Sequence, residues 1–393
     1  MGKTDVEEGT GSMEFRDLKQ QYTKYQREIN AAIQRVLDRG VFIGGEEVEE
    51  LEKNLAAYVG VKHCISCANG TEAMTLVLMA WNIGPGDAVF VPDFTFFSTA
   101  EVVAFLGATP IFVDVKWETF NMDPYRLKEA IEKVIQEKKL TPKAVIPVDL
   151  FGLPAEHEAI RIIAKEYALK VLEDGAQGFG GRIGEKKAGS FGDAATTSFF
   201  PAKPLGCYGD GGAIFTKDDK LSQQLHSLKV HGKGDDKYDN VRIGVNSRLD
   251  TLQAAILQVK LNAFADHELE AVKKVGEWYA ALLKDMVEIP VIPVDYGSSY
   301  AQYTIKLKSR QQRDHLQQFL KGAGIPAMIY YQKPLHQQTA FSVLNEGDGG
   351  FEMSNRLSQV VLSLPIHPYL LKTEVEFIAD KISEYLKQEA KHE

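Results

Sequence analysis

The chain has 393 residues, of which 44% are hydrophobic and 25% charged, the balance of an ordinary globular protein long enough for two domains. Its net charge of −9 at pH 7, with no basic stripe, argues against nucleic acid as the main partner. No apolar run approaches the roughly 20 residues of a membrane helix. The three cysteines form no disulfide framework, which favours the cytoplasm. Residues 1–12 are polar and acidic, and we interpret them as a leader derived from an expression vector.

Along the chain, helical spacing appears over residues 17–39 and 46–58, and short β-rich runs then alternate with helical patterns. The β-rich runs cover residues 63–67, 88–91, 110–115, 143–150 and 169–173, and the helical patterns between them cover 72–81, 99–105, 123–136 and 156–167. This alternation predicts an α/β fold with a mainly parallel central sheet flanked by helices. Such sheets bind ligands at the carboxyl ends of their strands.

The later part of the chain changes character. Strands are expected over 193–200 and 212–216, a helix over 221–230, and a long helical region over 249–283 that bends near Ala263. Beyond it we expect strands over 302–307 and 326–330 and helices over 314–321 and 372–387. The sequence therefore predicts a large domain over residues 13–258 and a smaller C-terminal α/β domain over residues 259–393.

The stretch from Ser198 to Phe215 contains the first candidate for chemistry. Lys203 lies between Pro201 and Pro204, so this segment cannot continue as a helix, and a dense group of glycines follows it. Lys203 is either a surface residue on a turn or a lysine that forms a Schiff base with a carbonyl cofactor.

Two further patterns lie at predicted strand ends. Gly70 and Thr71 follow Asn69 between a strand and a helix, where free amides form either a phosphate site or an ordinary helix cap. Asp174 ends an apolar strand, where a buried carboxylate needs a partner. It either pairs with a cationic ligand such as a pyridinium nitrogen, or it caps a helix or forms a salt bridge.

Three other patterns are weaker. Cys64 and Cys67 lie along a strand without a second cysteine pair, which favours packing over redox or zinc chemistry. The glycines from Gly178 to Gly184 do not open a helix, so they are not a dinucleotide fingerprint. The aromatic residues around Phe96 follow a strand and either stack on a planar ring or pack in the core.

Taken together, these motifs are similar to those of the nucleotide-sugar aminotransferases, the DegT/StrS family of fold-type I enzymes that depend on pyridoxal 5′-phosphate (PLP). The resemblance covers everything after Met13 and is strongest over residues 173–177, 198–212 and 244–255, with Tyr330, Tyr331 and His336 also matching. The lysine stretch is most similar to the branch that makes amino sugars on UDP, which includes UDP-hexuronic acid 3-aminotransferases.

The resemblance implies a role for each matching residue. Lys203 would hold PLP as a Schiff base and act as general base and acid, and Asp174 would pair with the ring nitrogen. Further residues would bind the cofactor: Gly70, Thr71 and Ser198 at the phosphate, Gln177 near the ring's 3-oxygen and Phe96 on the ring face. In a homodimer with shared active sites, Asn246 would reach the partner's cofactor phosphate. Arg248, Tyr330 and Tyr331 would contact the sugar nucleotide of the partner. His336 would also bind the sugar nucleotide.

The implied reaction moves an amino group from L-glutamate to a keto-sugar on a nucleotide diphosphate, for a surface polysaccharide, lipopolysaccharide or other glycan. No metal is implied. The sugar, the nucleotide and amination at C3 or C4 stay open, so a 4-keto-6-deoxy-sugar aminotransferase on UDP or dTDP is an alternative. A non-catalytic regulator with the same fold is another, and a desulfurase using Cys207 is disfavoured because Cys207 lies so close to Lys203 in the chain.

Overall fold

The computed structural model describes residues 13–236, 238–344, 347 and 349–391. The segment interpreted as a leader, residues 1–12, lies outside the described residues. Among the helices of this described part, none is long and apolar enough to cross a membrane.

A seven-stranded sheet forms the centre of the molecule, in the spatial order β1-β9-β8-β5-β4-β2-β3. Only β9 runs against its neighbours β1 and β8, and the pairs among β3, β2, β4, β5 and β8 are all parallel. The prediction of a mainly parallel sheet is therefore confirmed. The strands are β1 (His63–Cys67), β2 (Asp87–Pro92), β3 (Thr109–Val113), β4 (Thr141–Val145), β5 (Lys170–Asp174), β8 (Ala194–Ser198) and β9 (Gly212–Thr216).

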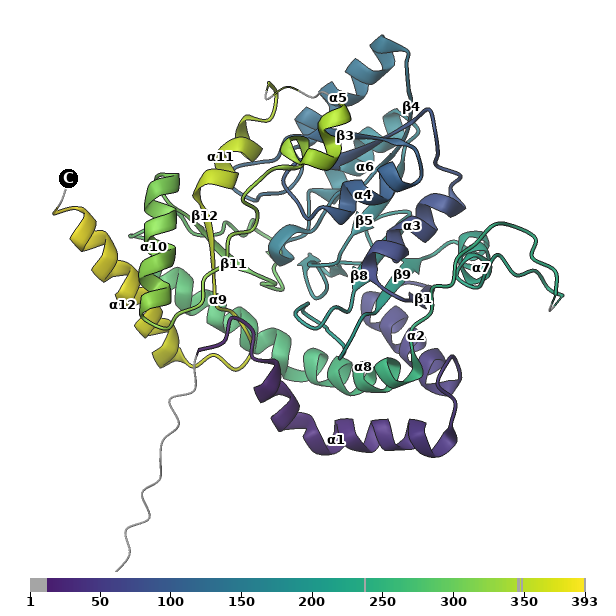
Figure 1. Cartoon of the computed structure of the whole chain (residues 1–393), viewed down its shortest axis with the longest axis horizontal. Coiled ribbons are helices and arrows are strands. Elements are labelled where there is room, and N and C mark those ends of the chain that lie inside the picture. The colour runs from purple at the N-terminus through teal and green to yellow at the C-terminus, as the bar shows by residue number, and fades with distance from the viewer. Residues whose placement is uncertain (1–12, 237, 345–346, 348, 392–393) are drawn as a thin grey trace, which may run out of the picture.

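Helices cover both faces of this sheet (Figure 1). Successive strand residues point to opposite faces, so Val89 joins one hydrophobic cluster and Phe90 another. The first cluster packs under α3 (Gly70–Ala80), α4 (Ser98–Phe105) and α7 (Asp219–Leu228), and the second under α5 (Pro124–Glu137) and α6 (His157–Glu166). Two helices near the edge, α2 (Glu46–Val59) and α8 (Thr251–Ala263), pack over β1 and β9, and α1 (Leu18–Arg39) lies along α8.

The predicted long helix of residues 249–283 is bent where expected. A π-helical segment, Phe264–Glu268, follows α8 and leads into α9 (Leu269–Leu283). Leu261 and Phe264 pack in the core of the large domain, whereas Val272 and Val275 pack in a second core. We propose that the domain boundary falls in this segment rather than at 258/259.

The second core belongs to a smaller domain seen at the left of Figure 1. It combines a two-stranded sheet of β11 (Tyr303–Lys306) and β12 (Val361–Leu364) with α9, α10 (Arg310–Gly322), α11 (Glu352–Val360) and α12 (Lys372–Glu389). Three short strands form a separate sheet beside the large domain: β6 (Arg182–Ile183), β7 (Lys186–Lys187) and β10 (Tyr296–Gly297). The remaining helical turns are Leu150–Gly152, Leu335–Gln337 and Thr339–Leu344.

Two predicted strands differ from the structure. The strand expected over 326–330 is wrong, because only Met328 forms a bridge there, to Ser363, and β11 pairs with β12 instead. The strand expected over 143–150 ends at Val145, shortly before Pro147, which has no N–H to donate to a sheet.

Candidate active site

A cavity of about 930 Å³ opens at the carboxyl ends of the parallel strands. Its walls come from the ends of β5 and β8, the start of α3, the loop after β2 and a segment before α11. The structure thereby brings together most of the residues singled out in the sequence: Gly70, Thr71, Phe96, Asp174, Gln177, Ser198, Lys203, Tyr330 and Tyr331.

The start of α3 forms one end of this cavity. Asn69 caps the helix, since its Oδ1 accepts a hydrogen bond of 2.8 Å from the N–H of Glu72. A Cβ atom at Gly70 would lie 2.8 Å from the Cβ of Ser198, so only glycine lets the helix come this close to β8. The helix N-terminus, Thr71 and Ser198 all line this part of the cavity, an arrangement that suits a phosphate group.

Asp174 lies at the end of β5 and is almost fully buried. Thr99 donates its hydroxyl proton to Asp174 Oδ2 at 2.8 Å, and the N–H of Ala176 donates to Oδ1 at 3.2 Å. Burial raises the pKa of this carboxyl, while these two donors and the nearby charge of Lys203 lower it. A protonated pyridine nitrogen would supply the cationic partner that the buried carboxylate calls for.

Gln177 links three parts of the cavity wall. Its Oε1 accepts a hydrogen bond of 2.8 Å from the N–H of Phe151, and its Nε2 donates to the Tyr331 hydroxyl at 3.0 Å. Its carbonyl oxygen also accepts a bond of 3.0 Å from Ser299. The amide is thus held in one orientation beside Asp174 in the cavity wall.

Lys203 lies in a turn that its N–H closes by donating to the Phe200 carbonyl at 2.8 Å. Its side chain is half-buried and lines the cavity that also contains Asp174. Burial lowers the pKa of the Lys203 amine, Asp174 raises it, and the guanidinium of Arg16 lowers it further. A lowered pKa favours the neutral amine, the form that acts as nucleophile and base.

Close backbone approaches explain two of the glycines after Lys203. A Cβ atom at Gly206 would lie 2.6 Å from the Phe200 carbonyl oxygen, and one at Gly212 would lie 2.5 Å from that of Asn69. Neither position has room for a side chain, so these glycines hold the lysine turn against β8 and α3.

Phe96 and the two tyrosines line the open part of the cavity. The Phe96 ring is half-exposed and lies 6.4 Å from the ring of Tyr331, inclined at 45°. Tyr330 and Tyr331 were expected to contact the partner's substrate, but they line the same cavity as Lys203 of their own chain.

Three expected residues lie elsewhere. Asn246 and Arg248 are exposed and do not line the cavity of their own chain. His336 is buried behind the cavity wall, where its Nδ1 lies 2.7 Å from Asp93 Oδ2 and its ring stacks on Phe351 at 4.4 Å. His336 therefore does not line the cavity, and its contact with the sugar nucleotide stays a prediction. Lys333 and Gln338, which sequence reasoning did not select, line the cavity nearby.

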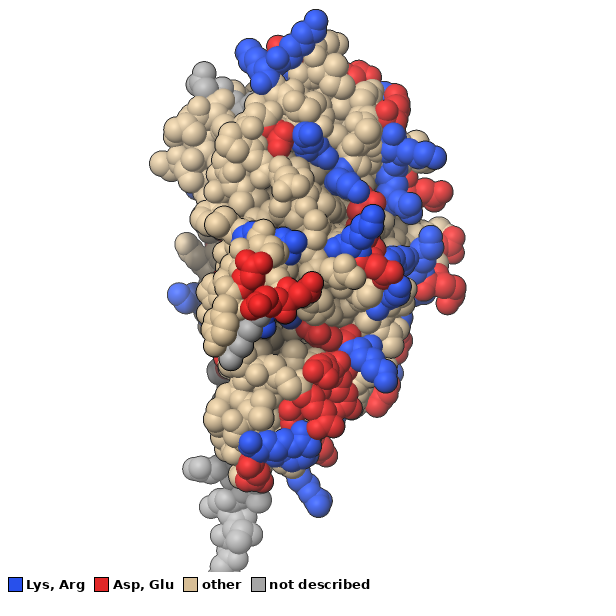
Figure 2. All heavy atoms as spheres, turned by 90° about the vertical axis from the view of Figure 1, so that its right-hand side faces the viewer, with Lys and Arg blue, Asp and Glu red and all other residues tan. Residues whose placement is uncertain are grey.

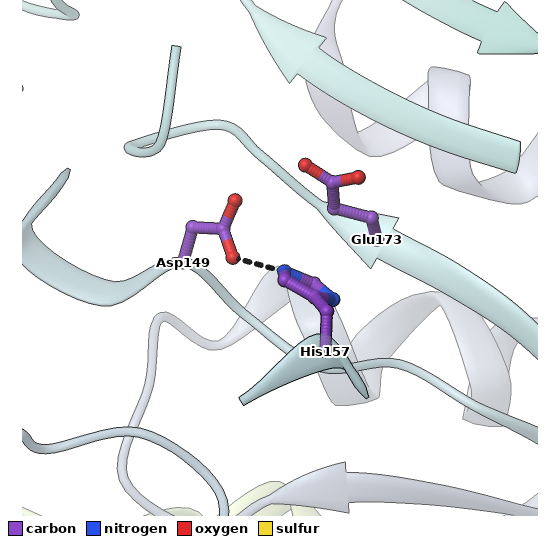
Figure 3. Close-up of side chains that lie close together, drawn as sticks. All are labelled: Asp149, His157 and Glu173. Carbon is purple, nitrogen blue, oxygen red and sulfur yellow. Dashed lines mark hydrogen bonds and ion pairs between the residues drawn. The ribbon is translucent and has the colours of Figure 1, made fainter. Parts of the chain in front are cut away.

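Behind the cavity, three buried titratable side chains lie close together: Asp149, His157 and Glu173 (Figure 3). His157 Nε2 lies 2.7 Å from Asp149 Oδ1, and Glu173 accepts backbone hydrogen bonds from Gly189 and, at 2.8 Å, from Phe191. Burial raises the pKa of Asp149 to about 7 and that of Glu173 to about 8, and lowers that of His157 to about 4.

This buried cluster is tied to the cavity through the backbone. The N–H of Asp149 donates to the carbonyl of Asp174 at 3.1 Å, and a Cβ atom at Gly178 would lie 2.5 Å from Asp149 Oδ2. The cluster therefore fixes the loops behind Asp174 and Gln177. Sequence reasoning missed it, because its members are brought together only by the packing of β4, β5 and α6.

The cysteines have no part in the cavity. Cys64, Cys67 and Cys207 are buried and form no disulfide, and the first two pack in hydrophobic clusters beside β1. Burial raises the pKa of the Cys207 thiol to about 11, and its Sγ lies 3.1 Å from the Phe199 carbonyl oxygen and 3.2 Å from that of Gly209, so either can accept its proton. A protonated thiol held in this way is no nucleophile for a desulfurase.

Comparison with known proteins agrees with this cavity. Residues 23–383 match the model of the DegT/DnrJ/EryC1/StrS aminotransferase family, and the chain belongs to that family. Its enzymes depend on PLP, so the protein is a PLP-dependent aminotransferase with the fold of that class. The donors at Gly70, Thr71 and Ser198, the carboxylate of Asp174 and the amine of Lys203 fit that cofactor.

Individual relatives are similar over nearly their whole length. The UDP-2-acetamido-2-deoxy-3-oxo-D-glucuronate aminotransferase of Pseudomonas aeruginosa is 46% identical over 93% of this chain and 98% of its own. A protein of Geobacillus stearothermophilus described as a pleiotropic regulatory protein is 42% identical over 94% of this chain and 97% of its own. The crystal structure of a DegT DnrJ EryC1 StrS aminotransferase from Brucella abortus is 49% identical, with a TM-score of 0.92 over 95% of this chain and 99% of that one.

Proposed function

We propose that this aminotransferase moves the amino group of L-glutamate to the C3 keto group of a UDP-linked sugar of the hexuronic acid type. The observation that carries the proposal is that Lys203 and Asp174 face one cavity of about 930 Å³, enough for the cofactor together with part of a nucleotide sugar. The relative from Pseudomonas aeruginosa, whose description specifies a 3-oxo-glucuronate on UDP, supports the choice of sugar and nucleotide.

Each residue is assigned a task in this reaction. When bound, PLP supplies a carbonyl that condenses with amines and a ring that accepts electrons released at the donor's Cα. Gly70, Thr71 and Ser198 would hold its phosphate, and Gln177 and Phe96 would contact its ring. The carboxylate of Asp174 would keep the ring nitrogen protonated, which would strengthen the pull on those electrons.

Lys203 moves the protons. Its Nζ would take up the Cα proton of the amino donor and pass it to the bound cofactor. In the second half-reaction Lys203 would move a proton from the cofactor to the sugar carbon that has received the nitrogen. The burial that lowers the pKa of this amine keeps more of it neutral and ready to accept a proton.

We further propose a homodimer in which Asn246 and Arg248 complete the partner's active site. Both residues are exposed. An antiparallel bridge between Ile43 and Asp250 joins the segment that contains them to the segment after α1, and both segments expose apolar side chains. Exposed apolar residues on these two segments are Leu37, Val41, Phe42, Ile43, Val241 and Ile243, and such a patch marks an interaction surface.

The surface charge and the thiols suit a cytoplasmic enzyme of small-molecule substrates. On the face drawn in Figure 2, lysine and arginine side chains alternate with acidic ones and are not gathered into a stripe. The three free thiols agree with a reducing compartment, and we propose the cytoplasm.

The test is a substrate panel. The PLP-loaded enzyme is incubated with L-glutamate and a set of UDP- and dTDP-linked 3-keto and 4-keto sugars, with and without a sugar carboxylate. The position of any new amine is then located by NMR. We expect amination at C3 of the UDP-linked 3-keto-hexuronate, whereas amination of a dTDP-linked 4-keto sugar alone would refute the proposal.

A further inference from the structure

A second, much smaller cavity lies on the other side of the Lys203 turn. Its space of about 20 Å³ has room for one or two water molecules. Of all the residues that line it, only Lys203 also lines the large cavity. The polar side chains around it come from the N-terminal segment, α1, α8, the π-helical segment and the loop before α12, and they include Arg16, Gln21, Lys260, Glu268, His367 and Tyr369. We call this space the lysine chamber.

Two cationic side chains, Arg16 and Lys260, line the lysine chamber together with the neutral amine of Lys203. Its acidic residues are Asp17 and Glu268. The carboxylate of Glu268 already accepts hydrogen bonds from Gln21, at 3.0 Å, and from the Tyr369 hydroxyl. Asp17 is engaged in capping α1, where its Oδ1 accepts from the N–H of Gln20 at 2.7 Å.

The cations, by contrast, lack full partners among the described residues. Lys260 is 2% exposed, its ammonium group donates no hydrogen bond there, and its Nζ lies 4.9 Å from the centre of the Tyr208 ring. The guanidinium of Arg16 donates one hydrogen bond, of 3.3 Å, to the Ala301 carbonyl. Cationic side chains left in this state call for an acceptor that carries negative charge.

We propose that the lysine chamber binds the side-chain carboxylate of the amino donor, with Arg16 as its main partner. This inference rests on the proposed function, which places the amino donor beside Lys203. Since Lys203 lines both cavities, a donor bound there lies next to the lysine chamber. The chamber holds one carboxylate group but not a whole amino acid, so the reacting end stays in the large cavity. Arg16 then selects a dicarboxylic donor over one with a short apolar side chain.

The test uses glutarate, a dicarboxylate without an amino group, and needs no sugar substrate. Binding of glutarate to the PLP-loaded enzyme is measured by calorimetry for the wild type, Arg16→Gln and Arg16→Lys. We expect Arg16→Gln to weaken binding about 10- to 100-fold, since a charge-assisted hydrogen bond is lost, and Arg16→Lys to weaken it less. Arg126→Gln, an exposed arginine paired with Glu129 on α5, is the matched control and should bind glutarate as the wild type does.

Kinetics give a second readout. Arg16→Gln should raise the KM for glutamate by a similar factor and leave the KM for the keto-sugar unchanged. Lys260→Met, on the opposite wall, should also weaken glutarate binding, and the thermal midpoint and bound PLP of each variant report on folding. The inference is wrong if Arg16→Gln binds glutarate as the wild type does, or if the wild type binds chloride but not glutarate.

Failure of the proposed function is distinguishable from failure of this inference. An enzyme that aminates none of the sugars refutes the first, yet its glutarate affinity still reports on Arg16. An enzyme that aminates the expected sugar with an unchanged glutamate KM in Arg16→Gln refutes only the second.

Discussion

Thr99 and Asp174, which lie 75 positions apart in the chain, are joined by a hydrogen bond of 2.8 Å between the Thr99 hydroxyl and Asp174 Oδ2. The threonine comes from α4 and the aspartate from the end of β5. The bond stabilises the charged form of a carboxylate whose burial otherwise favours the neutral form. It also sets the direction in which the carboxylate faces the cavity.

Replacing Thr99 by Val should therefore weaken cofactor binding. Loss of a hydrogen bond to a charged, buried carboxylate costs about 1.5–3 kcal/mol, so we expect the Kd for PLP to rise about 10- to 100-fold. Thr99→Ser keeps the hydroxyl and should bind PLP nearly as the wild type does. Equal PLP affinity of Thr99→Val and wild type, measured by titration of the apoenzyme, would show that Thr99 does not act through Asp174.

Tyr331→Phe should reduce turnover without releasing the cofactor. The change leaves the Nε2 of Gln177 without the acceptor it now has at 3.0 Å, and the amide becomes free to rotate. We expect kcat/KM for the keto-sugar to fall about tenfold, in line with one unsatisfied buried donor. Tyr125→Phe, at an exposed position of α5, is the control. An unchanged kcat/KM for Tyr331→Phe would contradict the role given to the Gln177 contact.

Gly178→Ala tests the packing between the Gln177 turn and the buried cluster behind it. The new Cβ atom would lie 2.5 Å from Asp149 Oδ2, and overpacking of this kind costs about 1–3 kcal/mol. We expect a lower midpoint of thermal unfolding and weaker binding of PLP. Gly322→Ala, where no atom lies within 4 Å of the new Cβ, should neither lower the midpoint nor weaken PLP binding. The account fails here if both variants unfold at the same temperature.

Lys260 gives a prediction about pH. Burial lowers its pKa from 10.5 to about 8, so between these values the unfolded chain binds more protons than the native one. Stability should therefore rise with pH over this window, by up to about 3 kcal/mol from this group. Lys260→Met should flatten the rise and raise the thermal midpoint at pH 7.

The measurement compares thermal midpoints at pH 7, 8.5 and 10 in buffer without carboxylates. Lys321→Met, an exposed lysine on α10, should keep the pH dependence of the wild type. If Lys260→Met retains the full rise between pH 8 and 10, the buried lysine is not its source.

The parallel sheet and most helices of this protein could be predicted from the sequence because each is defined by a local pattern of residues. Strand–helix alternation predicted the parallel sheet, and the bend near Ala263 lies at the π-helical segment. The pattern does not reveal β12, because α11 ends at Val360 and β12 begins at the next residue, Val361, with no turn residue to separate them. The apolar run from Pro326 predicts a strand that the structure does not contain.

The candidate site was predictable only in part for the same reason. Asp174 and Lys203 stand out because each departs from the pattern around it, a carboxylate on an apolar strand and a lysine between prolines. Thr99 and Arg16 carry no such local signal, since their surroundings come from segments far away in the chain. His336 matched a family motif, yet the structure pairs it with Asp93 and buries it.

The central claim is that Lys203 binds PLP and moves the protons of transamination, and Lys203→Ala tests it most directly. Wild type and variant are loaded with PLP, and the visible absorption of the Schiff base and the rate of glutamate half-reaction are measured on both. We predict that the variant loses the Schiff-base absorption and all turnover while keeping its thermal midpoint close to that of the wild type. A folded Lys203→Ala variant that retains both the absorption and the turnover would contradict the account.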